Sequence, residues 1–230
     1  MKHLLLVFIL LVGNLIIAQD HIVDERFDPL DYQPSNPITS SNSRLISSWG
    51  LNTNLLEDDE LINVWGANSF TLSYKYDVHL FEGVHWNLGI GYNWDNYNLK
   101  IGNDMLLHDS ISHDKAKLGV QNVVFKTAIR FQSSKDLKKA FYLEVGSYVN
   151  VKTFAKYTTW DEVAEMKLKN ETTSLNYVTP FYYGVEAKLG YGVLSLYAKY
   201  RLSDIFESTV NYKELPRLSI GVVIEVWDLE

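Results

Sequence analysis

The chain has 230 residues, of which 47% are apolar and 13% aromatic, a composition that suits one domain with a large buried or lipid-facing surface. Its formal net charge of −7 argues against nucleic acid as a partner, because phosphate binding needs clustered Lys and Arg. Since the chain has no cysteine, disulfide frameworks, thiol nucleophiles, thiolate metal sites and a lipid-anchored N-terminal cysteine are excluded.

The first segment has the pattern of a secretory signal peptide. Lys2 and His3 precede an apolar run over 4–17 that is too short for a comfortable transmembrane helix, and a small residue, Ala18, follows it. The stretch that comes next holds three prolines and a Ser/Asn cluster without periodicity. We therefore expect a signal peptide over 1–18, a periplasmic tail over 19–43 and a folded domain over 44–230.

Eight stretches of alternating apolar and polar residues follow, and each is predicted to be a β-strand. In chain order they are 44–54, 69–80, 84–97, 121–131, 141–152, 177–189, 192–202 and 217–227. Short turns are expected at 81–83, 132–140 and 190–191, and long loops at 55–68, 98–120, 153–176 and 203–216.

The connections therefore alternate between long and short. An even number of strands, with tight turns at one rim and long loops at the other, is typical of a bacterial outer-membrane barrel. The predicted fold class is all-β: a closed, antiparallel, eight-stranded, up-and-down transmembrane β-barrel. Its predicted location is the bacterial outer membrane.

Alternate side chains of a strand form two rows, one on each face of the sheet. In the last stretch the apolar row, which we expect to contact lipid, is Leu218, Ile220, Val222, Ile224 and Val226. At roughly 3.3 Å per residue and a tilt of about 40°, such a row spans on the order of 25 Å, the height of a lipid-facing band.

The opposite rows are polar and are predicted to line the lumen. The predicted luminal charge network is Lys75, Asp77, Lys126, Arg130, Glu144, Glu186, Lys199, Arg201, Arg217 and Glu225, with Asp95, Lys152 and Lys188 on the same rows. Eight strands enclose a lumen just wide enough for side chains to fill, and an unpaired buried charge costs several kcal/mol. We therefore expect a plug of ion pairs rather than a wide pore, with Glu144 in reach of Lys126 or Arg130.

The final hairpin reads YAKYRLSDIF over 197–206 and LPRLSIGVVI over 215–224. It resembles the closing strands of the PorT-like outer-membrane β-barrel family, in which a Tyr/Lys-rich strand, a Leu-Ser step and a loop lead to a Leu-Ser-Ile-Gly strand. The resemblance covers about 44–227. It implies a barrel rather than an activity, and it implies outer-membrane lipid and envelope or secretion-system proteins as partners.

Three segments carry candidate chemistry. The run HDSISHD over 108–114 holds the residue types of a Ser–His–Asp triad, but neighbours at the tip of a long loop are poorly placed for a rigid triad, so we expect no enzymatic activity and no cofactor. The acidic run 57–60 could collect Ca²⁺, and a solvated loop tip is the favoured interpretation. His79 and His85 are expected to face one another across the first turn, as a proton-sensitive latch or, more commonly, as solvated side chains.

The sequence favours a monomeric outer-membrane barrel with a plugged lumen that acts through its outer loops or tail in adhesion, docking or envelope integrity. An outer-membrane lipid-modifying enzyme is one alternative and needs Ser, His and an acid close together at the outer leaflet. A narrow passive channel is a second and needs a continuous, unpaired polar lumen. A soluble secreted ligand-binding barrel is a third and would put the apolar rows inside.

Overall fold

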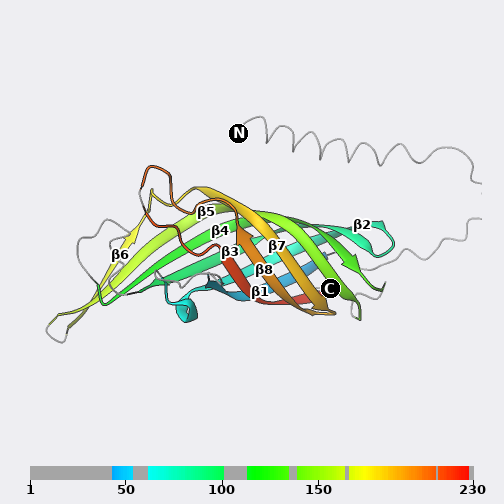
Figure 1. Cartoon of the computed structure of the whole chain (residues 1–230), viewed down its shortest axis with the longest axis horizontal. Helices are drawn as coiled ribbons and strands as arrows, with labels where there is room; N and C mark the ends of the chain where they lie inside the picture. Colours follow the sequence, from blue (N-terminus) through cyan, green and yellow to red (C-terminus); the bar gives the residue numbers. More distant parts are fainter. Residues whose placement is uncertain are drawn as a thin grey trace, which may run out of the picture. The chain divides into compact units, whose positions relative to one another are not determined.

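The computed structural model describes residues 43–53, 62–100, 113–134, 139–163, 166–210 and 212–227, and Figure 1 shows their arrangement. The predicted signal peptide, the predicted tail up to residue 42 and the acidic run 57–60 lie outside these residues. Among the described residues, no helix is long and apolar enough to cross a membrane.

The described residues form nine strands in one antiparallel sheet. The strands are β1 (Ser43–Thr53), β2 (Asn68–Phe81), β3 (Val84–Leu99), β4 (Lys115–Gln132), β5 (Phe141–Val163), β6 (Met166–Thr173), β7 (Phe181–Tyr191), β8 (Leu194–Arg201) and β9 (Leu218–Trp227), with one 3₁₀ turn, η1 (Val64–Gly66), between β1 and β2. Strand β9 pairs back onto β1, and β5 pairs with both β4 and β7. Eight strands therefore close a ring, as predicted, and β6 stands outside the ring, paired to β5.

The two rims of the ring differ. The connections β2–β3, β4–β5 and β7–β8 are short and share a rim with the start of β1 and the end of β9; we call this rim the turn end. The opposite rim, the loop end, carries the long connections. The last short turn lies at Gly192 and Val193 rather than at the predicted 190–191, so β7 runs two residues further and β8 begins two residues later than predicted.

Every strand of the ring exposes large apolar side chains on its outer face. We call this surface the apolar belt: Trp49, Phe70, Leu72, Tyr74, Tyr76, Leu88, Ile90, Phe125, Phe131, Phe141, Leu143, Val145, Val149, Val151, Phe154, Phe181, Tyr183, Val185, Leu189, Leu194, Leu196, Tyr200, Ile220, Val222, Ile224 and Val226. Ile220, Val222, Ile224 and Val226 of the predicted lipid-facing row of β9 are part of it, whereas Leu218 of that row is only partly exposed. Val223, between Val222 and Ile224, is fully buried. A belt of this extent is far larger than the apolar patches that proteins expose to water.

Glycines on the inner rows leave room for large side chains that cross the lumen. An ideal Cβ built at Gly184 would lie 2.6 Å from the hydroxyl oxygen of Tyr148, a separation that side chains do not adopt. Tyr148 itself is buried. The small residue on one strand thus accommodates the tyrosine of its neighbour, and the lumen is filled at this level.

Toward the loop end the polarity of the two faces inverts. On β4, Lys115 and Lys117 point outward, whereas Ala116, Leu118 and Val120 point inward and are buried. This part of the barrel thus has the pattern of a soluble protein, with an apolar interior and a polar exterior. The inversion marks the level at which the surrounding medium changes from lipid to water.

The predicted loops 98–120 and 153–176 are wrong in part, since both contain strand residues. In β5, Gln121 faces Phe154 while Asn122 faces Lys152, so Thr153 is an extra residue, a β-bulge. On the turn-end side of the bulge, even-numbered residues of β5 face inward. On its loop-end side, odd-numbered residues such as Ala155 and Tyr157 face inward. This change of phase ends the alternation that sequence analysis follows. Strand β6 is exposed at every residue, so its two faces do not differ in burial.

Candidate functional site

A buried ion-pair network fills the lumen toward the turn end. Glu144 on β5 is one centre: it accepts from Lys75 (2.5 Å), Arg130 (3.0 Å) and Lys188 (3.2 Å), and also from the side-chain amide of Asn87 (3.0 Å). The predicted pair of Glu144 with Arg130 is therefore present. All four donors come from different strands, so one carboxylate ties β2, β3, β4 and β7 to β5.

Glu225 on β9 is the second centre. Arg130 donates to both of its oxygens, at 2.6 and 2.8 Å, and Arg44 donates at 2.7 Å. Arg44 in turn pairs with Asp77 on β2. The predicted charge network did not include Arg44, which lies at the start of β1. Its inward position follows from the alternation of that strand.

A third carboxylate, Glu186, lies between two lysines. Lys126 and Lys188 approach it at 2.9 Å each. Because Lys188 also reaches Glu144, the three carboxylates and their bases form one connected network. A cavity of about 10 Å³ lies beside Lys75, Glu144 and Glu186, which is room for roughly one water molecule.

Three predicted members of the network lie away from it. Lys199 is near mid-lumen, where its Nζ is 5.4 Å from the centre of the Tyr148 ring. Arg201 is buried at the loop end and pairs with Glu214. Arg217 is not a luminal residue: it lies one position before β9, is partly exposed, and pairs with Asp204 at the loop end.

A chain of hydrogen bonds centred on Asp95 continues the filling, on the loop-end side of the ion-pair network. The hydroxyl of Tyr182 donates to Asp95 (2.9 Å) and accepts from Asn122 (2.7 Å). Asn93 also donates to Asp95, at 2.5 Å, and accepts from Thr71 at 2.6 Å. These contacts connect β2, β3, β4 and β7 across the lumen.

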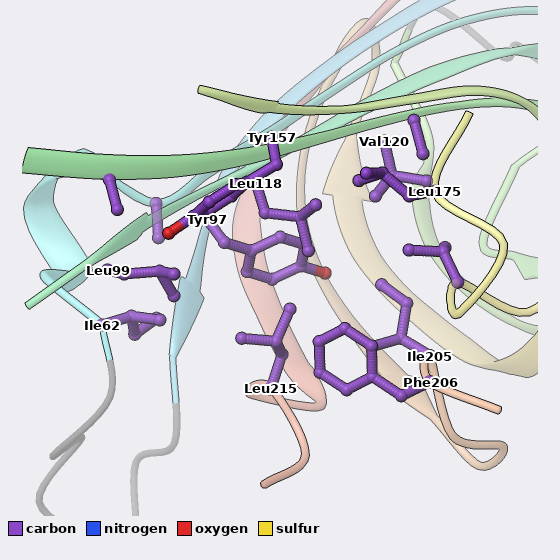
Figure 2. Close-up of a cluster of buried hydrophobic side chains, with 14 of the residues drawn as sticks. Ile62, Tyr97, Leu99, Leu118, Val120, Tyr157, Leu175, Ile205, Phe206 and Leu215 are labelled. Atoms are coloured by element: carbon purple, nitrogen blue, oxygen red, sulfur yellow. The ribbon is translucent and has the colours of Figure 1, made fainter. Parts of the chain in front are cut away.

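At the loop end an apolar cluster closes the barrel, a feature that the sequence analysis did not predict. We call it the apolar plug: Ile62, Ala67, Tyr97, Leu99, Ala116, Leu118, Val120, Ala155, Tyr157, Leu175, Val178, Tyr182, Ile205, Phe206 and Leu215. Figure 2 shows the ring of Tyr97 between Leu118, from a strand, and Leu215, from the β8–β9 connection. The long connections thus fold inward and contribute side chains to a core.

Basic residues of the strands hold these connections in place. Arg201 donates to the carbonyls of Leu215 (2.9 Å) and Pro216 (3.2 Å), and Glu214 accepts from the backbone N–H of Ile205 (3.1 Å). Lys152 bonds the carbonyl of Leu175 at 3.2 Å in the β6–β7 connection. The positions of Arg201 and Lys152 on inner rows were predictable, whereas their partners were not, because those partners are backbone atoms and one loop carboxylate.

Residues 108–112 of the candidate triad segment lie outside the described residues. Its last two residues have structural contacts: Nδ1 of His113 is 2.9 Å from each carboxylate oxygen of Asp161, and Asp114 accepts from the backbone N–H of Glu162 at 2.8 Å. These contacts fasten the start of β4 to the far part of β5.

His79 and His85 face one another near the turn end, as predicted. They are paired across the β2–β3 hairpin, and their rings meet edge to face with centres 5.1 Å apart.

A closed ring with an outer apolar belt satisfies every condition of a transmembrane barrel: its backbone groups are paired along the strands, and no open edge of the ring meets lipid. Tight turns at one rim and long connections at the other are the arrangement of bacterial outer-membrane barrels, in which the turns face the periplasm. The protein is a small barrel of the bacterial outer membrane.

No family model matches the chain, and no curated protein matches it at a significant level. Among solved structures it is similar to Ail, the attachment invasion locus protein of Yersinia pestis, with a TM-score of 0.31 and 13% identity over 80% of this chain and 93% of that chain. A structure of Ail in complex with the heparin analogue sucrose octasulfate gives a TM-score of 0.29 and 12% identity, over 80% and 94%.

Proposed function

We propose that this outer-membrane barrel is a docking protein that acts through its loop end and conducts no solutes. Its lumen is filled at three levels, by the ion-pair network, the Asp95–Tyr182 chain and the apolar plug. Each level uses side chains from several strands, so no single rearrangement opens a path. A narrow channel, one of the alternatives, would need a continuous wet lumen.

The observation that carries the proposal is exposed apolar surface at the loop end, where the barrel meets water rather than lipid. Beyond the belt, β6 exposes Met166 (64%) and Leu168 (49%), and η1 exposes Trp65 (87%). These residues lie at the loop end, outside the apolar belt. Large apolar side chains exposed to water at an extracellular rim are typical of a protein-binding surface.

The closing hairpin supports a finer assignment. Its resemblance to PorT-like barrels favours an envelope or secretion-system protein as the partner, and the expected state of the barrel itself is a monomer. Catalysis forms no part of the proposal.

A photo-crosslinking amino acid placed at Leu168 in intact cells tests this proposal. A discrete protein adduct is expected at Leu168, and none at Val222, which faces lipid. Met166→Ser in the same molecule should reduce the adduct while heat-modifiable mobility shows an intact barrel. Equal labelling at both positions, or no protein adduct at Leu168, would contradict the docking role.

A further inference from the structure

A groove of about 330 Å³ lies on the outer face of the barrel where the apolar belt ends. Strands β3, β4, β5 and β6 all contribute to its walls. Gly119 is one of its lining residues, and a Cβ there would be in ordinary van der Waals contact with Oδ1 of Asn96 (3.4 Å) and the carbonyl oxygen of Lys156 (3.9 Å). The groove is therefore built into the sheet rather than formed by a loop.

The wall nearest the loop end is cationic. Strand register puts Lys117 opposite Thr158, Lys156 opposite Gly119, and Lys169 opposite Trp160, so all three lysines are on one face within three adjacent rows. Lys115 continues the cluster, with its Nζ 5.2 Å from the Trp160 ring centre.

The lysines outnumber the acids that face them. Glu171 pairs with Lys169 at 2.6 Å and with Lys156 at 3.2 Å. The other carboxylate at the groove, Asp95, points into the lumen, where Tyr182 and Asn93 donate to it. Burial lowers the pKa of Lys117, and the neighbouring charges of Lys115 and Lys156 lower it further.

The wall nearest the turn end is aromatic and belongs to the lipid-facing surface. Phe154 is a belt residue, and Trp94 packs on Phe70 of the belt with ring centres 5.5 Å apart. The groove therefore lies between the edge of the hydrocarbon region and a cluster of ammonium groups. In an outer-leaflet lipid, the headgroup lies at this level.

We propose that this groove binds a phosphorylated headgroup of an outer-leaflet lipid, with the phosphate on Lys117, Lys156 and Lys169 and the acyl chains over Trp94 and Phe154. Lysine binds phosphate as a compact point charge without a required geometry, which suits a flexible cluster of this kind. The aromatic wall favours a lipid over a free anion, because a soluble phosphate would gain nothing from Trp94 and Phe154. The inference does not depend on the partner proposed for β6.

The test is native mass spectrometry of the purified full barrel with lipid A, with lipid A from which both phosphates have been removed, and with inorganic phosphate. One lipid A per barrel is expected, with at least about tenfold weaker binding of the dephosphorylated form. The double variant Lys117→Ala/Lys156→Ala should lose lipid A binding by a similar factor. Lys139→Ala/Lys213→Ala removes the same charge away from the groove and should bind as the wild type does.

The variant Glu171→Gln distinguishes lipid A binding by Lys156 and Lys169 from a purely structural role of their ion pairs with Glu171. Removing this carboxylate frees Lys156 and Lys169, so lipid A should bind several-fold more tightly, whereas loss of a structural ion pair would leave binding equal or weaker. Heat-modifiable mobility establishes that each variant is folded. Equal loss in the two double variants would overturn the site, and competition by inorganic phosphate with equal binding of both lipid forms would overturn the lipid headgroup as the ligand.

Discussion

Arg130 and Glu225 are 95 residues apart in the chain, and their side chains share two hydrogen bonds of 2.6 and 2.8 Å across the lumen. Both side chains are fully buried. The pair joins β4 to β9, which are not neighbours in the ring. The barrel wall is therefore braced from within as well as along its hydrogen-bonded strands.

Glu225→Gln should destabilise the folded barrel by about 3–5 kcal/mol, because it removes the negative charge that the buried Arg44 and Arg130 share and leaves them only Asp77 and Glu144 as carboxylate partners. Urea unfolding in lipid vesicles, followed by heat-modifiable mobility, measures this change. Arg217→Ala is the matched control, since it removes an exposed pair with Asp204 and should cost less than about 1 kcal/mol. Equal losses of stability in the two variants would show that removing a carboxylate from the buried network costs no more than breaking an exposed ion pair.

Ile220→Arg should cost about 2–4 kcal/mol if its position is near the bilayer midplane, since it puts a charge on the lipid-facing row of β9. The same unfolding assay in vesicles reports the effect. Ile220→Leu keeps the apolar character and is expected to change stability little. A charge tolerated at residue 220 without loss of stability would contradict the belt.

The purified wild-type barrel should show no steady single-channel currents in planar bilayers. Glu144→Ala should reduce stability without opening a pore, because Tyr142, Tyr148 and the apolar plug remain in place. Stable currents of porin size from the wild type would reverse the assignment in favour of the channel alternative.

Arg201→Ala should loosen the β8–β9 connection, because Arg201 bonds Glu214 and two loop carbonyls. Trypsin should then cleave after Lys213 faster than in the wild type, in barrels whose strands stay folded. Arg217→Ala serves as the comparison, since Arg217 contacts the same connection from a partly exposed position. An unchanged cleavage rate in Arg201→Ala would mean that apolar packing alone holds the connection.

The sequence predicted the ring because period-two alternation is a direct consequence of strand geometry, and it is strongest where one face meets lipid. Residues such as Ile220 and Glu144 could therefore be placed on the correct face from the sequence. The β5–β6 hairpin could not, because the Thr153 bulge shifts the phase and β6 has solvent on every side chain.

The candidate site divides in the same way. Inward charges could be identified one by one, but their pairing depends on which strands lie across the lumen, as for Arg130 and Glu225. The apolar plug escaped prediction because Ile205, Phe206 and Leu215 lie in irregular segments, where no periodicity reveals burial. The groove at Gly119 needs residues of four strands and is visible only in three dimensions.

Strand β5 runs for 23 residues, from the turn end past the belt. At about 3.3 Å per residue it is roughly 75 Å long, with a hydrogen-bonded ladder to β4 along most of its length. Such a strand connects the two rims without interruption, so a force applied to the β5–β6 hairpin would be carried along the backbone of β5 and its ladder to β4 as far as the turn end. A partner docked at that hairpin, as proposed above, would be held by the full length of the barrel wall.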